Sequence, residues 1–245
     1  MSWMFPRRSG IRAPETREWI LGALYLPVFL FFLNFAILTY FPALGFPLTE
    51  PRNYFFANLL YMTVNFAVML LIFRRTLWQS LREFEGKMLL SVLIGFGMCY
   101  GANLVLTTAY TVLDIMPENY NQEAVNSLLG GYPLAMTLCT VVLAPLAEEC
   151  LFRGVLFAPL ARKCLPAAYA LSMFLFAGMH VFQFLGSMTA ANTILCLSLY
   201  LPASFSLCWV YQKTGNIWAS IFLHMFINFQ SVLASLLRSL MQAFL

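Results

Sequence analysis

Two glutamates and an arginine lie within an otherwise apolar run, APLAEECLFRGVLF, at Ala144–Phe157. A charged side chain at bilayer depth costs roughly 2.5–3.5 kcal/mol on insertion scales. Glu149 and Arg153 are four residues apart, so on a helix they share a face and can neutralise each other. Glu148 has Phe152 at that spacing and needs water, a proton or a partner from another helix. The pattern fits either a snorkelling cluster near a helix end or a functional carboxylate.

The two histidines of the chain also lie inside apolar segments, His180 in FAGMH and His224 in HMFIN. Asn228 follows His224 by four residues and therefore shares its helix face. A single histidine in a membrane helix often serves only as an interhelical hydrogen-bonding residue. The functional interpretation therefore depends on whether these side chains lie at a common depth.

The composition indicates whether these segments lie in a lipid bilayer or in water. The 245 residues are 61% hydrophobic and 10% charged, whereas a soluble domain is about 45–50% apolar and about 25% charged. We therefore predict an all-α, polytopic transmembrane bundle, that is, a multi-pass integral membrane protein. It would lie in the plasma or inner membrane of a prokaryote or in an ER-type membrane of a eukaryote. The formal net charge of +4 is too small to indicate nucleic-acid binding.

Seven runs are long enough to span a bilayer, which takes about 20 apolar residues. The predicted spans are Trp19–Phe41, Tyr54–Phe73, Met88–Leu113, Tyr132–Phe157, Ala167–Leu185, Thr189–Tyr211 and Asn216–Leu237. Residues 1–18 form a basic N-terminal segment, and residues 19–245 form a single membrane domain. The longest polar loop is predicted at Asp114–Asn126. The six cysteines form no CxxC pair and are typical of small buried side chains.

The basic residues orient the predicted bundle. With seven spans, most lysines and arginines fall on one side, which the positive-inside rule assigns to the cytoplasm. We therefore predict a cytoplasmic N-terminus and an external C-terminus. The basic segments on the cytoplasmic side contain Arg7, Arg8, Arg12, Arg17, Arg74, Arg75, Arg82, Lys87, Arg162, Lys163 and Lys213.

The buried polar groups fall at similar depths in this arrangement. At 1.5 Å per residue, Glu148 lies about 15 Å, His180 about 20 Å, His224 about 12 Å and Asn228 about 18 Å from the cytoplasmic surface. Unrelated polar residues would not need to coincide in this way, so we predict one shared site. A buried glutamate can act as a general base, and a histidine beside it can orient a water molecule. A second histidine and an asparagine can donate hydrogen bonds to an oxyanion. This set is suited to attack of water on a carbonyl group.

Other hydrolase signatures are missing from the sequence. It contains neither HExxH nor GxSxG, and Ser172, Ser204 and Ser206 lie inside predicted spans, where serines commonly bond to backbone carbonyls or pack between helices. None of the three is assigned as a nucleophile.

The motifs resemble those of the CPBP family of intramembrane proteases. EECLFRG matches EExxxR, FAGMH matches FxxxH, and HMFIN matches HxxxN, in the family's order and after the APLAEE lead-in. This family includes type II CaaX prenyl endopeptidases and bacteriocin-processing or self-immunity proteins. The resemblance covers roughly Leu134–Phe229, with the family-like core in 132–237.

The resemblance implies a glutamate-type, metal-independent endopeptidase. Glu148 would activate water, His180 would help to hold or deprotonate it, and His224 with Asn228 would stabilise the oxyanion. Glu149 and Arg153 match the remaining motif positions. Their spacing indicates a supporting ion pair, and a direct role for Glu149 stays open. Phe176 is interpreted as a packing ring.

Alternative functions remain open at this stage. Glu148, His180 and His224 could bind zinc in a metalloprotease, although the preferred mechanism needs no metal or other cofactor. The same residues could form a proton relay in a transporter, or stabilise a scaffold or immunity protein. The partners expected for the protease are the lipid bilayer and a peptide or membrane-anchored protein substrate, cut near the cytoplasmic side of the membrane. The sequence does not indicate whether the substrate is prenylated.

Overall fold

The computed structural model describes residues 11–244, and the side chains of residues 11–242. This part of the chain is an all-α bundle, and seven of its helices are long and apolar enough to cross a membrane. Their bounds are Thr16–Ala43, Pro51–Ile72, Lys87–Val112, Pro133–Ala161, Leu165–Ser187, Ala190–Thr214 and Ile217–Gln242. The predicted fold class and number of spans are confirmed, with each boundary displaced by a few residues.

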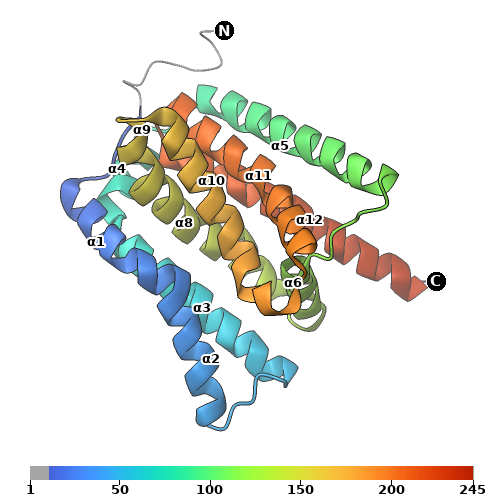
Figure 1. Cartoon of the computed structure of the whole chain (residues 1–245). Helices are drawn as coiled ribbons and strands as arrows, with labels where there is room; N and C mark the ends of the chain where they lie inside the picture. The colour runs from blue at the N-terminus through green and yellow to red at the C-terminus, as the bar shows by residue number, and fades with distance from the viewer. Residues whose placement is uncertain (1–10, 245) are drawn as a thin grey trace.

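The first two spans form an antiparallel pair at one side of the bundle (Figure 1). The first consists of α1 (Thr16–Pro27), a π-helical segment η2 (Val28–Phe32) and α2 (Leu33–Ala43). Pro27 has no amide hydrogen to donate, and the helical hydrogen bonding changes from α to π directly after it. The second span, α3 (Pro51–Ile72), begins with a proline at its first position, where the missing amide hydrogen costs nothing.

A short helix, α4 (Arg74–Arg82), joins the second and third spans where the sequence indicated only a basic connection. Its N-terminal cap comes from α1: the Glu18 carboxylate accepts hydrogen bonds from the backbone amides of Arg75 and Thr76, both at 3.1 Å. A carboxylate at a helix N-terminus satisfies free amides and complements the helix dipole. Glu18 is buried and fixes the start of α4 against α1.

The predicted polar loop Asp114–Asn126 is wrong in its second half. After α5 (Lys87–Val112), the connection ends at Asn119, and α6 (Tyr120–Gly131) begins. The Asn119 side chain accepts a hydrogen bond from the Gln122 amide at 3.1 Å and so caps the helix. The polar first turn hid this helix from a hydropathy reading, whereas its second half buries Leu128 and Leu129.

The fourth span lies at the centre of the bundle. Half of its apolar window is buried, against 17% for the first and third spans. It alternates between α and π geometry, through α7 (Pro133–Leu138), η3 (Cys139–Leu143), α8 (Ala144–Glu149), η4 (Cys150–Phe157) and α9 (Ala158–Ala161). Its neighbours include α3 on one side and α10 and α12 on others. Every predicted acidic site residue is therefore on the most enclosed helix.

The last three spans are α10 (Leu165–Val181) with its 3-10 extension η5 (Phe182–Ser187), α11 (Ala190–Thr214) and α12 (Ile217–Phe244). Gly215 ends α11 in the left-handed conformation, with φ of 65°, which glycine adopts without steric cost. The turn after it is fixed to α4, because the Asn216 side chain donates to the Ser80 carbonyl at 2.6 Å.

The basic connections meet at one end of the bundle. Arg12 forms an ion pair with Glu83 before α5, and its carbonyl accepts a hydrogen bond from Tyr211 near the end of α11. Arg162, after α9, donates to the carbonyl of Ile11 at 3.2 Å. These contacts place segments that were predicted to share one side of the membrane at the same end of the bundle. Arg7 and Arg8 lie outside the described residues, and the first helix begins at Thr16, so residues 16–18 of the predicted N-terminal segment belong to the bundle.

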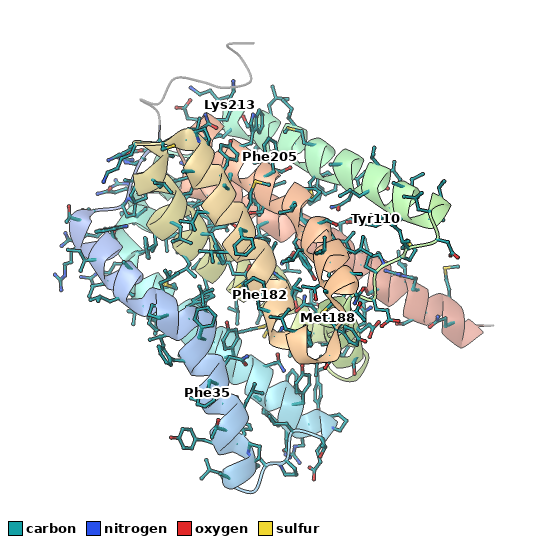
Figure 2. The ribbon with its side chains drawn as sticks, viewed as in Figure 1. Phe35, Tyr110, Phe182, Met188, Phe205 and Lys213 are labelled. Carbon is teal, nitrogen blue, oxygen red and sulfur yellow. The ribbon has the colours of Figure 1, made fainter. Side chains whose placement is uncertain are left out.

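Large apolar side chains cover the outer faces of the spans (Figure 2). Phe35 on α2 is 68% exposed, as expected for a ring that faces lipid acyl chains. Tyr110 on α5 is buried instead, and its hydroxyl lies 2.5 Å from that of Ser198 on α11. This polar contact is therefore kept inside the bundle, as a protein in a bilayer requires.

Candidate active site

Glu148 lies on α8, directly between the π-helical segments η3 and η4. A π turn changes the rotation from one residue to the next, and such turns occur often at functional sites. The residue is 8% exposed, and its Oε2 atom is buried without a hydrogen-bond partner. Glu148 lines a cavity of about 1090 Å³, whose walls also come from η2, α2, α3, α6, α10, α11 and α12. It therefore contributes a carboxylate to the cavity wall, and one oxygen of that carboxylate has no protein partner.

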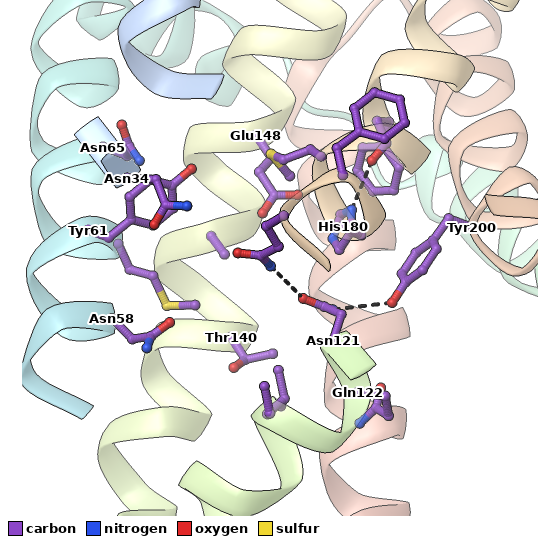
Figure 3. Close-up of a pocket in the computed structure, with 18 of the residues that line it drawn as sticks. Asn34, Asn58, Tyr61, Asn65, Asn121, Gln122, Thr140, Glu148, His180 and Tyr200 are labelled. Atoms are coloured by element: carbon purple, nitrogen blue, oxygen red, sulfur yellow. Dashed lines mark hydrogen bonds between the residues drawn. The ribbon is translucent and has the colours of Figure 1, made fainter. Parts of the chain in front are cut away.

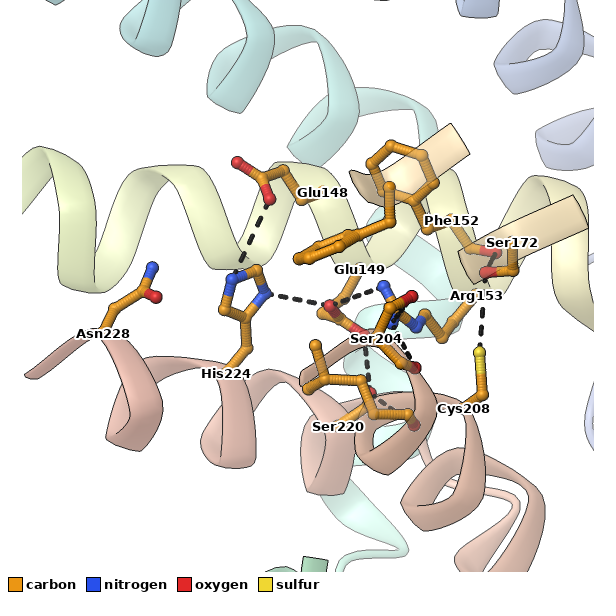
Figure 4. Close-up of polar contacts among 12 residues, drawn as sticks. Glu148, Glu149, Phe152, Arg153, Ser172, Ser204, Cys208, Ser220, His224 and Asn228 are labelled. Atoms are coloured by element: carbon orange, nitrogen blue, oxygen red, sulfur yellow. Dashed lines mark hydrogen bonds and ion pairs between the residues drawn. The ribbon is translucent and has the colours of Figure 1, made fainter. Parts of the chain in front are cut away.

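Glu149, the next residue, is fully buried, and both oxygens of its carboxylate accept hydrogen bonds (Figure 4). Its Oε1 accepts hydrogen bonds from Arg153 at 3.0 Å and from Nδ1 of His224 at 2.9 Å. Its Oε2 accepts a hydrogen bond from the Ser220 hydroxyl at 2.5 Å. The predicted Glu149–Arg153 contact is present, and Glu149 also ties α8 to α12 through two side chains that the spacing rule could not identify.

Arg153 is also completely buried. Besides the bond to Glu149, it donates to the backbone oxygen of Ser204 at 3.1 Å and to the Ser204 hydroxyl at 3.3 Å. Buried charges are tolerated when they are both paired and hydrogen-bonded. Arg153 therefore remains inside the bundle and does not extend to the membrane surface, so the snorkelling interpretation of this cluster does not hold.

His224 bridges the two glutamates. Its Nδ1 contacts Glu149, and its Nε2 lies 3.8 Å from Oε2 of Glu148. Oε1 of Glu149 also accepts a hydrogen bond from Arg153, so it is the acceptor here and Nδ1 carries the hydrogen. The 3.8 Å separation between Nε2 and Oε2 of Glu148 is too long for a direct hydrogen bond. Nε2 accepts a proton in the neutral imidazole and donates one in the imidazolium.

His180 has a fixed orientation on α10. Its Nδ1 lies 2.9 Å from the carbonyl oxygen of Phe176. A carbonyl only accepts, so Nδ1 is the donor and Nε2 of the neutral ring is left as an acceptor. The ring also stacks on Tyr200 of α11, with centroids 4.6 Å apart. Figure 3 shows His180 and Glu148 on the wall of the same cavity.

Tyr200 is in turn held by the start of α6. Its hydroxyl donates to the Asn119 side chain at 3.0 Å. It accepts from the Asn121 amide at 3.2 Å, the bond drawn in Figure 3. This support was not predicted from the sequence. The available signal was a tyrosine inside an apolar span, together with two asparagines at the start of an unrecognised helix.

Phe176 separates the two imidazoles. Its ring centroid lies 4.9 Å from that of His180 and 5.5 Å from that of His224. The Arg153 guanidinium lies 5.0 Å from the same ring, within the range of a cation–π contact. The ring is 2% exposed. Phe176 is thus a packing residue, as the sequence analysis interpreted it.

Asn228 lies one turn beyond His224 on α12, and it lines the cavity. One hydrogen of its side-chain amide is donated to the carbonyl oxygen of Thr140 at 2.8 Å. This bond holds the amide against the fourth span and leaves its second N–H hydrogen available. Glu148, His180, His224 and Asn228 therefore come from three spans and line one cavity.

The remaining lining of the cavity is uncharged. Among the residues that the structure describes, Glu148 is the sole carboxylate on its wall, and no lysine or arginine contributes. Many of the other polar groups are side-chain amides: Asn34, Asn58, Asn65, Asn103, Asn119, Asn121, Gln122 and Gln183.

The grouping of donor side chains bears on the zinc alternative. Within residues 11–244, no three histidine, cysteine, aspartate or glutamate side chains are grouped to hold a metal ion. The zinc alternative requires Glu148, His180 and His224 to converge. Nδ1 of His180 is held by the Phe176 carbonyl and Nδ1 of His224 by Glu149, and each ring keeps its Nε2 as a potential ligand.

Comparisons with known proteins agree with the motif resemblance. Residues 130–230 match the family described as "Type II CAAX prenyl endopeptidase Rce1-like". The chain is 28% identical over 166 residues to "Putative membrane peptidase YdiL" of Bacillus subtilis, and 28% identical over 127 residues to "UPF0177 protein YxdF" of Lactococcus lactis.

These matches cover 66% and 51% of this chain and 64% and 65% of the respective relatives. The chain thus spans just under two thirds of the relatives that it matches. No solved structure gives a significant match. The resemblance predicted from the three motifs is confirmed for the segment that carries Glu148, His180, His224 and Asn228.

Proposed function

We propose that this chain is an intramembrane endopeptidase in which Glu148 activates a water molecule for direct attack on a peptide carbonyl. The observation that carries the proposal is that Glu148 lines a large cavity, while its buried Oε2 has no hydrogen-bond partner and lies 3.8 Å from Nε2 of His224. The match of residues 130–230 to a family of endopeptidases supports the same reaction class.

The charges of the cluster favour this chemistry. Glu149 and Arg153 neutralise each other, so Glu148 and His224 can hold one proton between them without a net buried charge. When that proton is on His224, Glu148 is ionised and can act as a base. At the same time, Nε2 of His224 becomes a hydrogen-bond donor that faces the cavity.

The hydrolysis then follows from these positions. Glu148 takes a proton from water as the water oxygen bonds to the carbonyl carbon of the substrate. His224 and the free N–H of Asn228 stabilise the negative oxygen that develops. As the C–N bond breaks, Glu148 gives its proton to the departing amine. The products are a carboxylate and an amine, and no covalent bond to the enzyme forms.

His180 has a supporting role in this proposal. Its Nδ1 is committed to the Phe176 carbonyl, so Nε2 is a fixed acceptor for a hydrogen of the attacking water. The stacked Tyr200 prevents the ring from turning. Orientation of the water by two acceptors, Glu148 and His180, would direct its lone pair toward the substrate.

The substrate is proposed to be a peptide or a membrane-anchored protein. A cavity of about 1090 Å³ lies at the upper limit of ordinary ligand pockets and can hold several residues of a peptide. The charge distribution predicts cleavage near the cytoplasmic side of the membrane. A prenylated C-terminus, a peptide leader and a membrane-anchored sorting tail all remain compatible with the site.

A comparison of membrane peptidomes tests the proposed function. Cells that carry the wild-type chain should contain cleavage products that are missing from cells with Glu148→Ala, and the uncut precursors should accumulate in the latter. The exposed Glu123→Gln variant is a matched control and should resemble the wild type. Identical peptidomes for wild type and Glu148→Ala, together with a retained cellular phenotype, would instead favour a scaffold.

A further inference from the structure

Asn65 lines the cavity opposite the residues assigned to chemistry, and it carries a second unpaired polar group. It lies on α3, is 1% exposed, and its amide nitrogen Nδ2 has no hydrogen-bond partner. Its oxygen accepts a hydrogen bond from the Tyr25 hydroxyl at 2.9 Å, which fixes the orientation of the amide. Figure 3 shows Asn65 at the α3 wall, across the cavity from His180 and Tyr200.

Thr140 supplies another unpaired group on the adjoining wall. Its hydroxyl Oγ1 is buried without a partner, whereas threonine hydroxyls in membrane helices commonly bond to the carbonyl one turn earlier. The nearby Thr137 follows this rule and donates to the Pro133 carbonyl at 2.7 Å. Thr140 lies in the π-helical segment η3, which packs against α3 and α12.

A buried donor without a partner is costly and therefore calls for an explanation. Packing does not explain it, because Asn58 on the same α3 wall satisfies its own amide at the Tyr54 carbonyl, 2.9 Å away. The two unpaired groups are buried, and the residues that carry them, Asn65 and Thr140, both line the cavity that contains Glu148.

We propose that Asn65 and Thr140 bind the backbone of an uncharged peptide segment and hold it across Glu148. The inference rests on the proposed function and specifies its substrate: Nδ2 of Asn65 donates to a peptide carbonyl, and the Thr140 hydroxyl pairs with a second backbone group. Because the described lining has no lysine or arginine, charged residues of the substrate and its terminal carboxylate lie outside this cavity. Asn65 precedes the family-matched segment 130–230, so the first spans contribute to the choice of substrate.

The test measures binding separately from cleavage. A pooled library of acetylated, amidated decapeptides made only of uncharged residues is selected on purified Glu148→Gln protein, and the dissociation constant of the enriched peptide is then determined. In this background, Asn65→Leu and the nearly isosteric Thr140→Val should each weaken binding about 3- to 10-fold. The controls Asn53→Leu and Thr137→Val, whose polar groups are already satisfied and which lie outside the cavity, should leave it unchanged.

A thioamide scan of the enriched peptide identifies the bond itself. A thioamide sulfur is a weaker acceptor than a carbonyl oxygen, so one position should weaken binding to protein with Asn65 and have no effect with Asn65→Leu. If Asn65→Leu weakened binding only by changing the packing, the thioamide would weaken binding to both proteins equally. If Asn65→Leu is unstable, Thr140→Val carries the same comparison.

The outcomes are distinguishable. Equal affinities for all four variants, equal losses in the controls, or no enriched uncharged peptide would each overturn the inference. If binding depends on Asn65 and Thr140 but wild-type protein does not cut the enriched peptide, the binding site stands and the proposed endopeptidase activity fails.

Discussion

The Nδ1 atom of His224 lies 2.9 Å from Oε1 of Glu149, so the imidazole on α12 is anchored to the ion-paired glutamate of α8. This contact turns Nε2 of His224 toward Glu148. Adjacent glutamates therefore have different surroundings: Glu149 is saturated by Arg153, Ser220 and His224, and Glu148 keeps an unpaired oxygen. The first pattern is that of a supporting residue, and the second is that of a reactive one.

Replacement of Glu149 should destabilise the bundle. Glu149→Gln leaves the Arg153 guanidinium buried without a counter-charge, and removal of one partner of a buried pair typically costs about 3–5 kcal/mol. Thermal unfolding of the purified variant in micelles should show a clear decrease in midpoint. Glu123→Gln, at an exposed position on α6, should unfold like the wild type. Equal midpoints for both variants would contradict a stabilising role for the pair.

Chelators should leave cleavage unaffected. The described side chains provide no three-ligand cluster. We expect the rate of cleavage of a peptide identified from the peptidome to be unchanged by EDTA or 1,10-phenanthroline. Loss of activity with chelator, restored by added zinc, would favour the metalloprotease alternative.

Labelling of Cys164 should establish the orientation. It is the exposed member of the six cysteines, all within the described residues, and it follows the basic pair Arg162 and Lys163. The positive-inside rule places this turn in the cytoplasm. A membrane-impermeant maleimide should therefore label Cys164 only after the cells are permeabilised. Thr49→Cys in a Cys164→Ser background should be labelled in intact cells, and the reverse pattern would invert the topology.

Acid should loosen the segment at Ile11–Glu15. The hydrogen bond from Arg12 holds the pKa of the Glu83 carboxyl below its ordinary value. Its contribution is therefore complete above the ordinary glutamate pKa of about 4.3 and is lost as the pH falls through the lower folded value. Hydrogen exchange in this segment, corrected for intrinsic rates, should be faster at pH 3 than at pH 6. In Glu83→Gln protein the corrected rates should be equal at both values; a persistent difference would point to another group.

The spans and the members of the site were predictable because both depend on local signals. Apolar length predicts a membrane helix, and a polar residue such as His180 in an apolar run stands out against its neighbours. The Glu149–Arg153 contact followed from their spacing on one helix. The common cavity followed from the depths of four residues along their spans.

The links between helices were not predictable in the same way. The contact of Glu149 with His224 depends on how α8 and α12 are rotated about their axes, and the π-helical segments on either side of α8 alter that rotation. Helix α6 was missed because its first turn is polar. Asn65 stands out in the sequence as an amide inside an apolar span. Its proposed role, however, depends on the missing hydrogen-bond partner of its Nδ2, which only the structure shows.

The rate of peptide cleavage by purified Glu148→Gln protein tests the central claim most directly. With a peptide from the peptidome, measured beside wild-type protein in the same micelles, we predict a decrease of at least about 100-fold, the usual contribution of a general base. The folded state should be retained, because Oε2 of Glu148 has no partner to lose. Cleavage by Glu148→Gln at the wild-type rate would contradict the proposal that this carboxylate activates the water.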